Sequence, residues 1–190
     1  MKTIDIIHDE HRALASVLQA LRFVVGEIRS GKMPPDFHLL AAMVDYITQV
    51  PEKVHHPKED DYFFPKLRSR STKAAALIAI LEEQHSEGYR MTVALLQALI
   101  HYQSIGADGF AAFDSLLQQY LDFNWQHLNL EESELLPLAR EALTEADWLE
   151  LDTVFAANFD PFTGAEGEFE ALFRKIVNMT PAPYGLGPGT

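Results

Sequence analysis

The sequence predicts an all-α protein: an up-down-up-down four-helix bundle followed by a C-terminal helical extension. Two observations predict this fold. Apolar residues recur at helical spacing through four long segments, which glycine, proline and capping residues separate. A pattern of histidine, two acids, two apolar residues and proline also occurs twice in the same register, 72 residues apart. The repeat indicates that each half of the bundle is one helical hairpin.

The first predicted helix covers residues 2–30, and the glycine and proline pair that follow it end the helix. The second predicted helix begins after a capping aspartate, Asp36, and runs to about residue 69. Pro51 and Pro57 lie inside it. Because proline lacks an amide proton and its ring crowds the preceding turn, we expect a kink or a break there.

The third predicted helix covers residues 73–104 and the fourth covers residues 108–140. A threonine with an aspartate three residues later predicts a capped fifth helix over about 144–157. After a turn, a short sixth helix should run to about residue 178. The remaining segment, 181–190, is rich in proline and glycine and is expected to be extended.

Composition excludes several classes of function. The 190 residues fit one domain, and no run of 18 apolar residues predicts a membrane span. A formal charge of −13 argues against nucleic acid and anionic membranes as partners, and the N-terminal sequence lacks the layout of a signal peptide, so we expect a cytoplasmic protein. Because cysteine is absent, metal ligands can only be His, Asp, Glu or Tyr.

The repeated pattern carries the chemistry. Its two copies read HHPKEDDYFFP and HLNLEESELLP, and a lone histidine precedes them by 44 and 42 residues respectively. Residues four apart share one face of a helix, so each copy aims an imidazole and a carboxylate at one point. The candidate metal ligands are His11, His55, Glu59, His85, His127 and Glu131.

The candidate ligands also agree in height along the bundle. The two histidines of each predicted hairpin lie at matching distances from its turn, so one layer of the bundle can hold all of the candidates. This ligand set suits iron, manganese or zinc. Our interpretation is that His11 and His55 hold one metal, that His85 and His127 hold a second, and that the two glutamates bridge them.

Two alternatives remain at this point. One is a duplicated helical hairpin without metal. The other is a ferritin-like Glu-x-x-His arrangement, since Glu52 and Glu82 each lie three residues before a candidate histidine. These two glutamates fall at non-equivalent positions of the repeat, where the other copy has Asn124 and His8. The symmetry of the repeat therefore favours the His-x3-Glu set.

Several neighbouring residues are candidates for supporting roles. His56 and Asp60 lie about 100° round the helix from the motif histidine and glutamate, so we expect them beside the site or at the surface. A shift of register onto these two residues is the alternative. His8 shares a face with His11 and is expected to be a hydrogen-bonded partner near the site, with direct ligation as the alternative. Glu132 directly follows the second motif glutamate and is also a candidate for a supporting role beside the site.

The order and spacing of these residues resemble the hemerythrin-like HHE cation-binding domain family, over about residues 3–140. The resemblance implies a four-helix bundle that holds two iron ions in an oxo- or hydroxo-bridged pair, with zinc or manganese as other candidates. The four-His, two-Glu arrangement is most similar to members that repair iron–sulfur centres damaged by nitrosative stress. We expect no counterpart of the cysteine-containing N-terminal domain of those members, because the sequence has no cysteine.

The oxygen-carrying members differ from this chain at one ligand. They have a further histidine one turn after the ligand on the third helix, where this chain has Tyr89. We expect Tyr89 to be either a core residue or a hydroxyl close to the metals, and we expect no reversible transport of O2. The oxygen-carrying members also have a carboxylate ligand five residues after the last histidine. In this chain that position is Glu132.

The expected function is to bind, sense or react with O2, NO or peroxide at a di-iron site. The alternatives are a di-iron oxidoreductase or repair factor for damaged iron centres, and a protein that holds iron. The residues do not decide between an enzyme and a non-catalytic module. We assign the bundle and its site to residues 1–140, and we expect residues 141–190 to cover the bundle or to mediate a homodimer.

Overall fold

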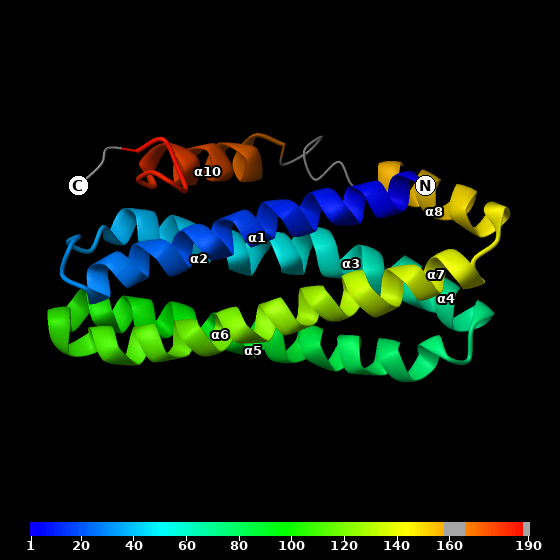
Figure 1. The fold of residues 1–190 in the computed structure, drawn as a ribbon, viewed down its shortest axis with the longest axis horizontal. Coiled ribbons are helices and arrows are strands. Elements are labelled where there is room, and N and C mark those ends of the chain that lie inside the picture. The colour runs from blue at the N-terminus through cyan, green and yellow to red at the C-terminus, as the bar shows by residue number, and fades with distance from the viewer. Residues whose placement is uncertain (158–165, 188–190) are drawn as a thin grey trace.

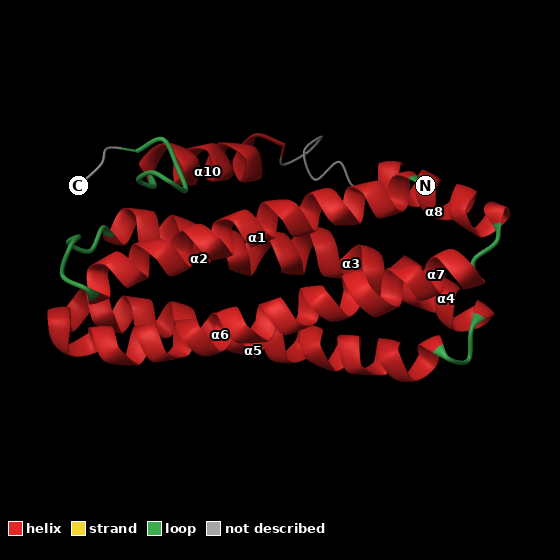
Figure 2. Ribbon diagram, viewed as in Figure 1, coloured by secondary structure: helices red, strands yellow, loops and turns green. Residues whose placement is uncertain are grey.

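The computed structural model describes residues 1–157 and 166–187. The protein is all-α, and four long helical rods lie side by side with alternating direction (Figure 1). Figure 2 shows no strand in the part of the chain that the structure describes. The β-type pairing there consists of one isolated bridge between Pro181 and Gly187. The predicted fold class, a helical bundle with a C-terminal helical extension, is confirmed.

The first rod is α1 (Lys2–Arg29), and Gly31 follows it with a φ of 72°, a conformation that favours glycine. The second rod begins with α2 (Phe37–Val50). The carboxylate of Asp36 accepts hydrogen bonds from two amides of the first turn of α2, so the predicted N-terminal cap is confirmed.

The second rod continues without a break beyond α2. Its next segments are η1 (Pro51–His55), α3 (His56–Lys58), η2 (Glu59–Phe63) and α4 (Phe64–Arg70). Both η segments are π-helical turns, which are wider than α-helical turns and are frequent at functional sites. The disturbance expected at the prolines therefore takes the form of a widened turn that begins at the first proline.

The second hairpin repeats this layout. The third rod is α5 (Ala74–Ile105), and the short helix η3 (Gly106–Gly109) connects it to the fourth rod. That rod contains α6 (Phe110–Leu130), a π-helical turn η4 (Glu131–Leu135) and α7 (Leu136–Ala142). The turn η4 lies 72 residues after η2, so a π-helical turn begins at the motif glutamate of both copies.

Two further helices cover one side of the bundle. The helix α8 (Glu145–Ala157) packs on α1, and α10 (Glu166–Met179) packs on α2 (Figure 1). The Thr144 hydroxyl donates to the Asp147 carboxylate and accepts from the Asp147 amide, which confirms the predicted cap of α8. The turn predicted between these helices lies outside the described residues.

The tail after α10 differs from its prediction in the part that the structure describes. Residues 181–187 fold back on α10 in a series of turns, so the expected extended segment is wrong there. The amide of Leu186 donates to the carbonyl of Val177, and that of Gly187 donates to the carbonyl of Thr180. A Cβ on Gly187 would lie 2.4 Å from the carbonyl oxygen of Met179, so the glycine permits the close approach.

The apolar core is divided into two clusters along the length of the bundle. The larger cluster includes Leu18, Leu40 and Leu117, and the smaller one includes Ile7 and Phe63. Between the clusters lies a layer of buried polar side chains at the level of the two repeated motifs. In the described part of the chain, no helix is both long and apolar enough to cross a bilayer.

Candidate metal centre

Each of the four rods contributes one buried imidazole to the polar layer. The second and fourth rods each add one glutamate, from the π-helical turn that begins at that residue. All six side chains are almost completely removed from solvent, because both apolar clusters close over them. The layer consists of His11, His55, Glu59, His85, His127 and Glu131.

One half of the layer lies between the first two rods. The Nε2 atoms of His11 and His55 are 3.1 Å apart. The Nε2 atom of His11 lies 3.2 Å from Oε2 of Glu131, and that of His55 lies 3.3 Å from Oε2 of Glu59. One donor atom from each of these four residues lies within 4.8 Å of the others. Ligand atoms about 2.1 Å from one ion are at most about 4.2 Å apart, so small shifts would complete a site.

The other half lies between the third and fourth rods. The Nε2 atom of His127 is 3.5 Å from Oε1 of Glu131, and that of His85 is 3.8 Å from the same oxygen. The Nε2 atom of His85 is also 3.6 Å from Oε2 of Glu59. Each glutamate therefore lies within reach of histidines from both halves. This placement is what two carboxylates that bridge a pair of ions require.

The outward Nδ1 atom of every one of these four histidines faces a side-chain oxygen. Such an acceptor fixes the proton on Nδ1 and leaves the Nε2 lone pair free for a metal. The pairs are His11 with Glu132 at 2.6 Å, His55 with Glu10 at 3.0 Å, His85 with Asp60 at 2.9 Å and His127 with Gln84 at 2.9 Å.

These acceptors obey the symmetry of the repeat. Glu10 and Gln84 each precede a lone histidine and orient the motif histidine of the same copy. Asp60 and Glu132 each follow a motif glutamate and orient the lone histidine of the other copy. Sequence reasoning missed Glu10 and Gln84. Their equivalent positions, directly before the two lone histidines, were the signal that could have identified them.

Most of the inward-facing atoms lack hydrogen bonds; the exceptions are the Nε2 atoms of His11 and His55, which contact each other. Both carboxylate oxygens of Glu59, both of Glu131, and the Nε2 atoms of His85 and His127 are buried without a hydrogen-bond partner. A buried polar group without a partner costs about 1–3 kcal/mol, and more if it is charged. Six such atoms in one layer therefore need to be compensated by protons or cations, and their donor set fits metal cations.

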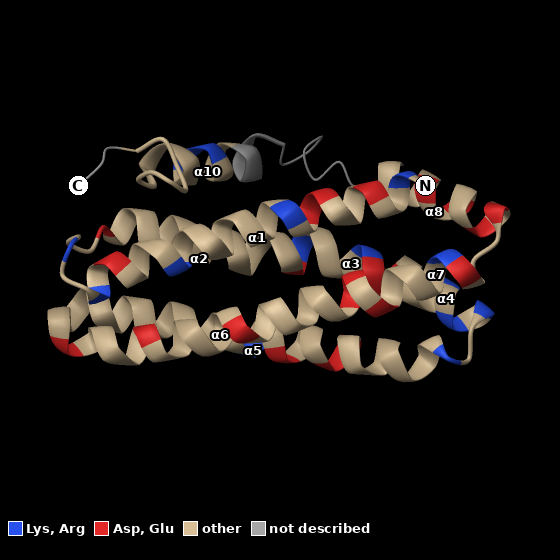
Figure 3. Cartoon of the chain, viewed as in Figure 1, with Lys and Arg blue, Asp and Glu red and all other residues tan. Residues whose placement is uncertain are grey.

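The charge of the layer agrees with two divalent ions. The two inward glutamates, the three outer carboxylates that face histidines and one ammonium group together carry four negative charges, because metal-bound imidazoles are neutral. The buried lysine pairs with one of the outer carboxylates. Figure 3 shows the acidic residues that gather around α3 at this level. The charged residues included in the count of four negative charges are Glu10, Lys58, Glu59, Asp60, Glu131 and Glu132.

Protons compete with cations for these groups. Burial and repulsion from Glu131 raise the pKa of Glu59 to about 7. Burial alone would lower the pKa of His85, but its hydrogen bond to Asp60 and the nearby carboxylates outweigh this effect and raise the pKa to about 9. Burial lowers the pKa of His127 to about 4. At neutral pH the metal-free layer therefore holds protons that a cation must displace.

Tyr89 does not belong to the site. Its side chain is 51% exposed on the outer face of α5, so both the expected core position and the expected approach to the metals are wrong. The face of α5 that packs inside the bundle contains His85, Gly88 and, one turn later, Thr92. Tyr89 therefore lies on the other side of the helix. The ring of Phe123 fills the space beside this glycine, 3.3 Å from where a Cβ would lie.

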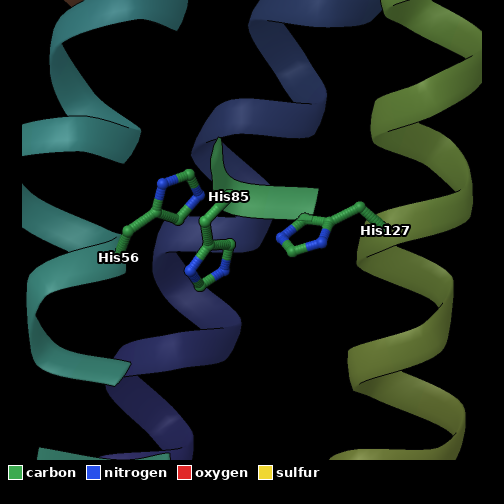
Figure 4. Close-up of side chains that lie close together, drawn as sticks. All are labelled: His56, His85 and His127. Carbon is green, nitrogen blue, oxygen red and sulfur yellow. The ribbon is translucent and has the colours of Figure 1, made fainter. Parts of the chain in front are cut away.

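The remaining neighbours lie close to the layer. The Nε2 atom of His8 is 3.1 Å from Oε2 of Glu132, so His8 is a partly exposed partner of an outer acceptor. His56 lies closer to the centre than we expected, because its ring stacks on that of His85 at 3.8 Å with an interplanar angle of 13°. One nitrogen each of His56, His85 and His127 lies within 4.8 Å of the other two (Figure 4).

The ferritin-like alternative finds no support in the geometry. Glu82 is partly exposed and pairs with Arg68 at 2.8 Å. The carboxylate of Glu52 lies 3.3 Å from Nδ1 of His56, on the outer side of the layer. Neither glutamate is among the grouped donor atoms.

A cavity of about 420 Å³ borders the layer between α1 and α6. His11 and Glu132 form part of its wall, together with Arg12, Ala15 and Trp125. The cavity therefore reaches an imidazole of the candidate site from the side of the molecule where Arg12 is exposed.

The comparisons agree with this geometry. The model of the hemerythrin HHE cation binding domain matches residues 2–139, which is most of the chain. The chain therefore belongs to the hemerythrin HHE cation-binding domain family. The helices α8 and α10 lie beyond the matched region. Searches among curated proteins and among solved structures find no significant match.

We predict that Glu59 matters more to metal binding than Asp60. Glu59→Gln should remove at least one bound ion per chain, because an inward carboxylate is lost. Asp60→Asn should keep both ions and weaken binding by about tenfold, since it changes only the acceptor that orients His85. Elemental analysis and metal titration of both variants would measure the difference. The reverse order would show that the register of the ligands is wrong.

Metal uptake should release protons and should depend on pH. Because His85 has a raised pKa of about 9 and Glu59 one of about 7, both groups hold protons in the metal-free protein below these values. The apparent affinity should therefore rise with pH between 6 and 9. Calorimetric titrations in buffers of different ionisation enthalpy would count the protons. An affinity that stays constant across this range would contradict the assignment.

Proposed function

We propose that this protein holds two iron ions in the polar layer and binds or reacts with O2, NO or peroxide there. In this proposal, one ion would be held by His11 and His55, and the other by His85 and His127. Both ions would be held by the carboxylates of Glu59 and Glu131. The observation that carries the proposal is the set of inward-facing donor atoms that are buried without hydrogen-bond partners.

Iron is the proposed metal because of the ligand chemistry. Imidazole and carboxylate ligands together suit iron, manganese and zinc, and the sequence contains no cysteine that would favour zinc or a cluster. A bound pair of irons supplies one- and two-electron redox chemistry toward small oxidants. Membership in a cation-binding family supports a metal function.

The protein supplies orientation, a dry environment and an entrance. The four outer acceptors hold the imidazoles in one tautomer and one direction, which preorganises the site. The two apolar clusters exclude water from both ends of the layer. The cavity beside His11 is large enough for a diatomic molecule or peroxide, and such an entrance favours ligand exchange over simple storage of iron.

We predict that the protein binds two ions per chain. His127→Ala should reduce the content by about one ion, because it removes one of the inward imidazoles. His101→Ala is the matched control, since His101 is exposed on α5 and should leave the content unchanged. Elemental analysis after anaerobic loading with ferrous iron would measure the ratio. Two ions per chain in both variants would refute the role of His127.

The cavity should control access to the site. Ala15→Phe should narrow it, so NO should change the absorption spectrum of the ferrous protein at least several-fold more slowly, with unchanged iron content. Ala112→Phe, an exposed position on α6, should behave as wild type. Stopped-flow spectroscopy would give both rates. Absence of any NO-dependent spectral change in the iron-loaded wild type would contradict the proposed function itself.

A further inference from the structure

We infer that the exposed face of α5 is an interface for a second copy of this chain, and that the two α5 helices pair antiparallel about a twofold axis. The inference is independent of the metal centre. It places the contact between copies on α5 and not on residues 141–190, where the sequence had led us to expect it.

An apolar stripe runs along the exposed side of α5. It consists of Tyr89, Val93, Leu96 and Ile100, whose exposed fractions lie between 37% and 55%. Their spacings of four, three and four residues keep these side chains on one line of the helix. Apolar residues that are exposed singly are ordinary, but a continuous stripe with this spacing is typical of a helix that packs against another helix.

The covering helices of this chain pack elsewhere. The helix α8 packs on α1, and α10 packs on α2 (Figure 1). The stripe stays exposed although both of these helices are in place. The occupant that we infer is therefore a second molecule.

The charge of the molecule favours a contact between copies at this face. Each chain has a formal charge of −13, so two copies repel each other wherever acidic surfaces meet. Residues 91–105 of α5 contain no Asp, Glu, Lys or Arg, whereas its N-terminal half contains acidic residues (Figure 3). Two acidic copies can therefore approach here with little repulsion, while a basic partner would gain no ion pairs from this stretch.

The spacing of the stripe fits an antiparallel pair. The order four, three, four is the same in both directions, so a twofold axis places Tyr89 opposite Ile100 of the second copy and Val93 opposite Leu96. A parallel pair would instead align the acidic N-terminal halves of the two helices, including Glu82, which lies on the line of the stripe seven residues before Tyr89. In the antiparallel pair each Glu82 lies beyond the end of the other α5.

The size of the face sets the expected strength of the dimer. From Tyr89 to the end of α5 the helix extends about 24 Å, and with the flanks of its neighbours the face is about 20 Å wide. Each copy would thus bury on the order of 500 Å², or about 1,000 Å² in total, which is near the lower limit of specific interfaces. We therefore expect a reversible dimer with a dissociation constant in the micromolar range.

The oligomeric state of the full chain tests this inference. Analytical ultracentrifugation of the wild type from micromolar to millimolar concentration should show a shift from the mass of one chain to that of two. Ile100→Glu should raise the dissociation constant by on the order of tenfold or more, because the twofold axis buries two added carboxylates. Ile80→Glu is the matched control, since Ile80 is 50% exposed on another face of α5 and the substitution adds the same charge.

The register can be tested separately because the chain contains no cysteine. Under oxidation, a mixture of Val93→Cys and Leu96→Cys should form a disulfide-linked dimer faster than either variant alone, since only the mixture places two thiols directly opposite each other. A wild type that remains a single chain up to millimolar concentration would overturn the inference, as would equal weakening by Ile100→Glu and Ile80→Glu. Equal cross-linking in all three cysteine samples would overturn the antiparallel pairing.

Discussion

The fold depends on one constraint: a layer of imidazoles and carboxylates must be buried between two apolar clusters. Glu59 and Glu131 are completely removed from solvent, and their oxygens accept no hydrogen bonds. Isolated buried carboxylates are strongly unfavourable, so the layer is stable only when cations or protons compensate them. The raised pKa values of Glu59 and His85 show that protons can fill this role, which makes metal binding and protonation competing solutions.

Much of the surrounding structure serves this layer. The four rods align so that their histidines meet at one height, and the π-helical turns η2 and η4 begin at the two inward glutamates. Outer acceptors are shared between the halves of the repeat, because Asp60 orients His85 while Glu132 orients His11. Each hairpin therefore helps to complete the site of the other, and neither half could build the layer alone.

The sequence was sufficient for the fold and for the placement of six side chains, because helical periodicity and a repeated motif fix both faces and heights. It was insufficient where the backbone departs from a regular α-helix. The π-helical turn before His56 brings this residue toward the layer, although a regular helix would turn it about 100° away. The prediction for Tyr89 failed for a different reason, since the buried face of the regular helix α5 passes through Gly88 instead. Glu10 was missed because its role depends on contact with another rod.

The central claim is that two metal ions hold the polar layer together, and anomalous X-ray diffraction at the iron absorption edge tests it most directly. Crystals of the iron-loaded protein should show two anomalous peaks inside the bundle. One should lie among His11, His55 and the glutamates, and the other should lie beside His85 and His127. A single peak, or peaks at the protein surface only, would contradict the account.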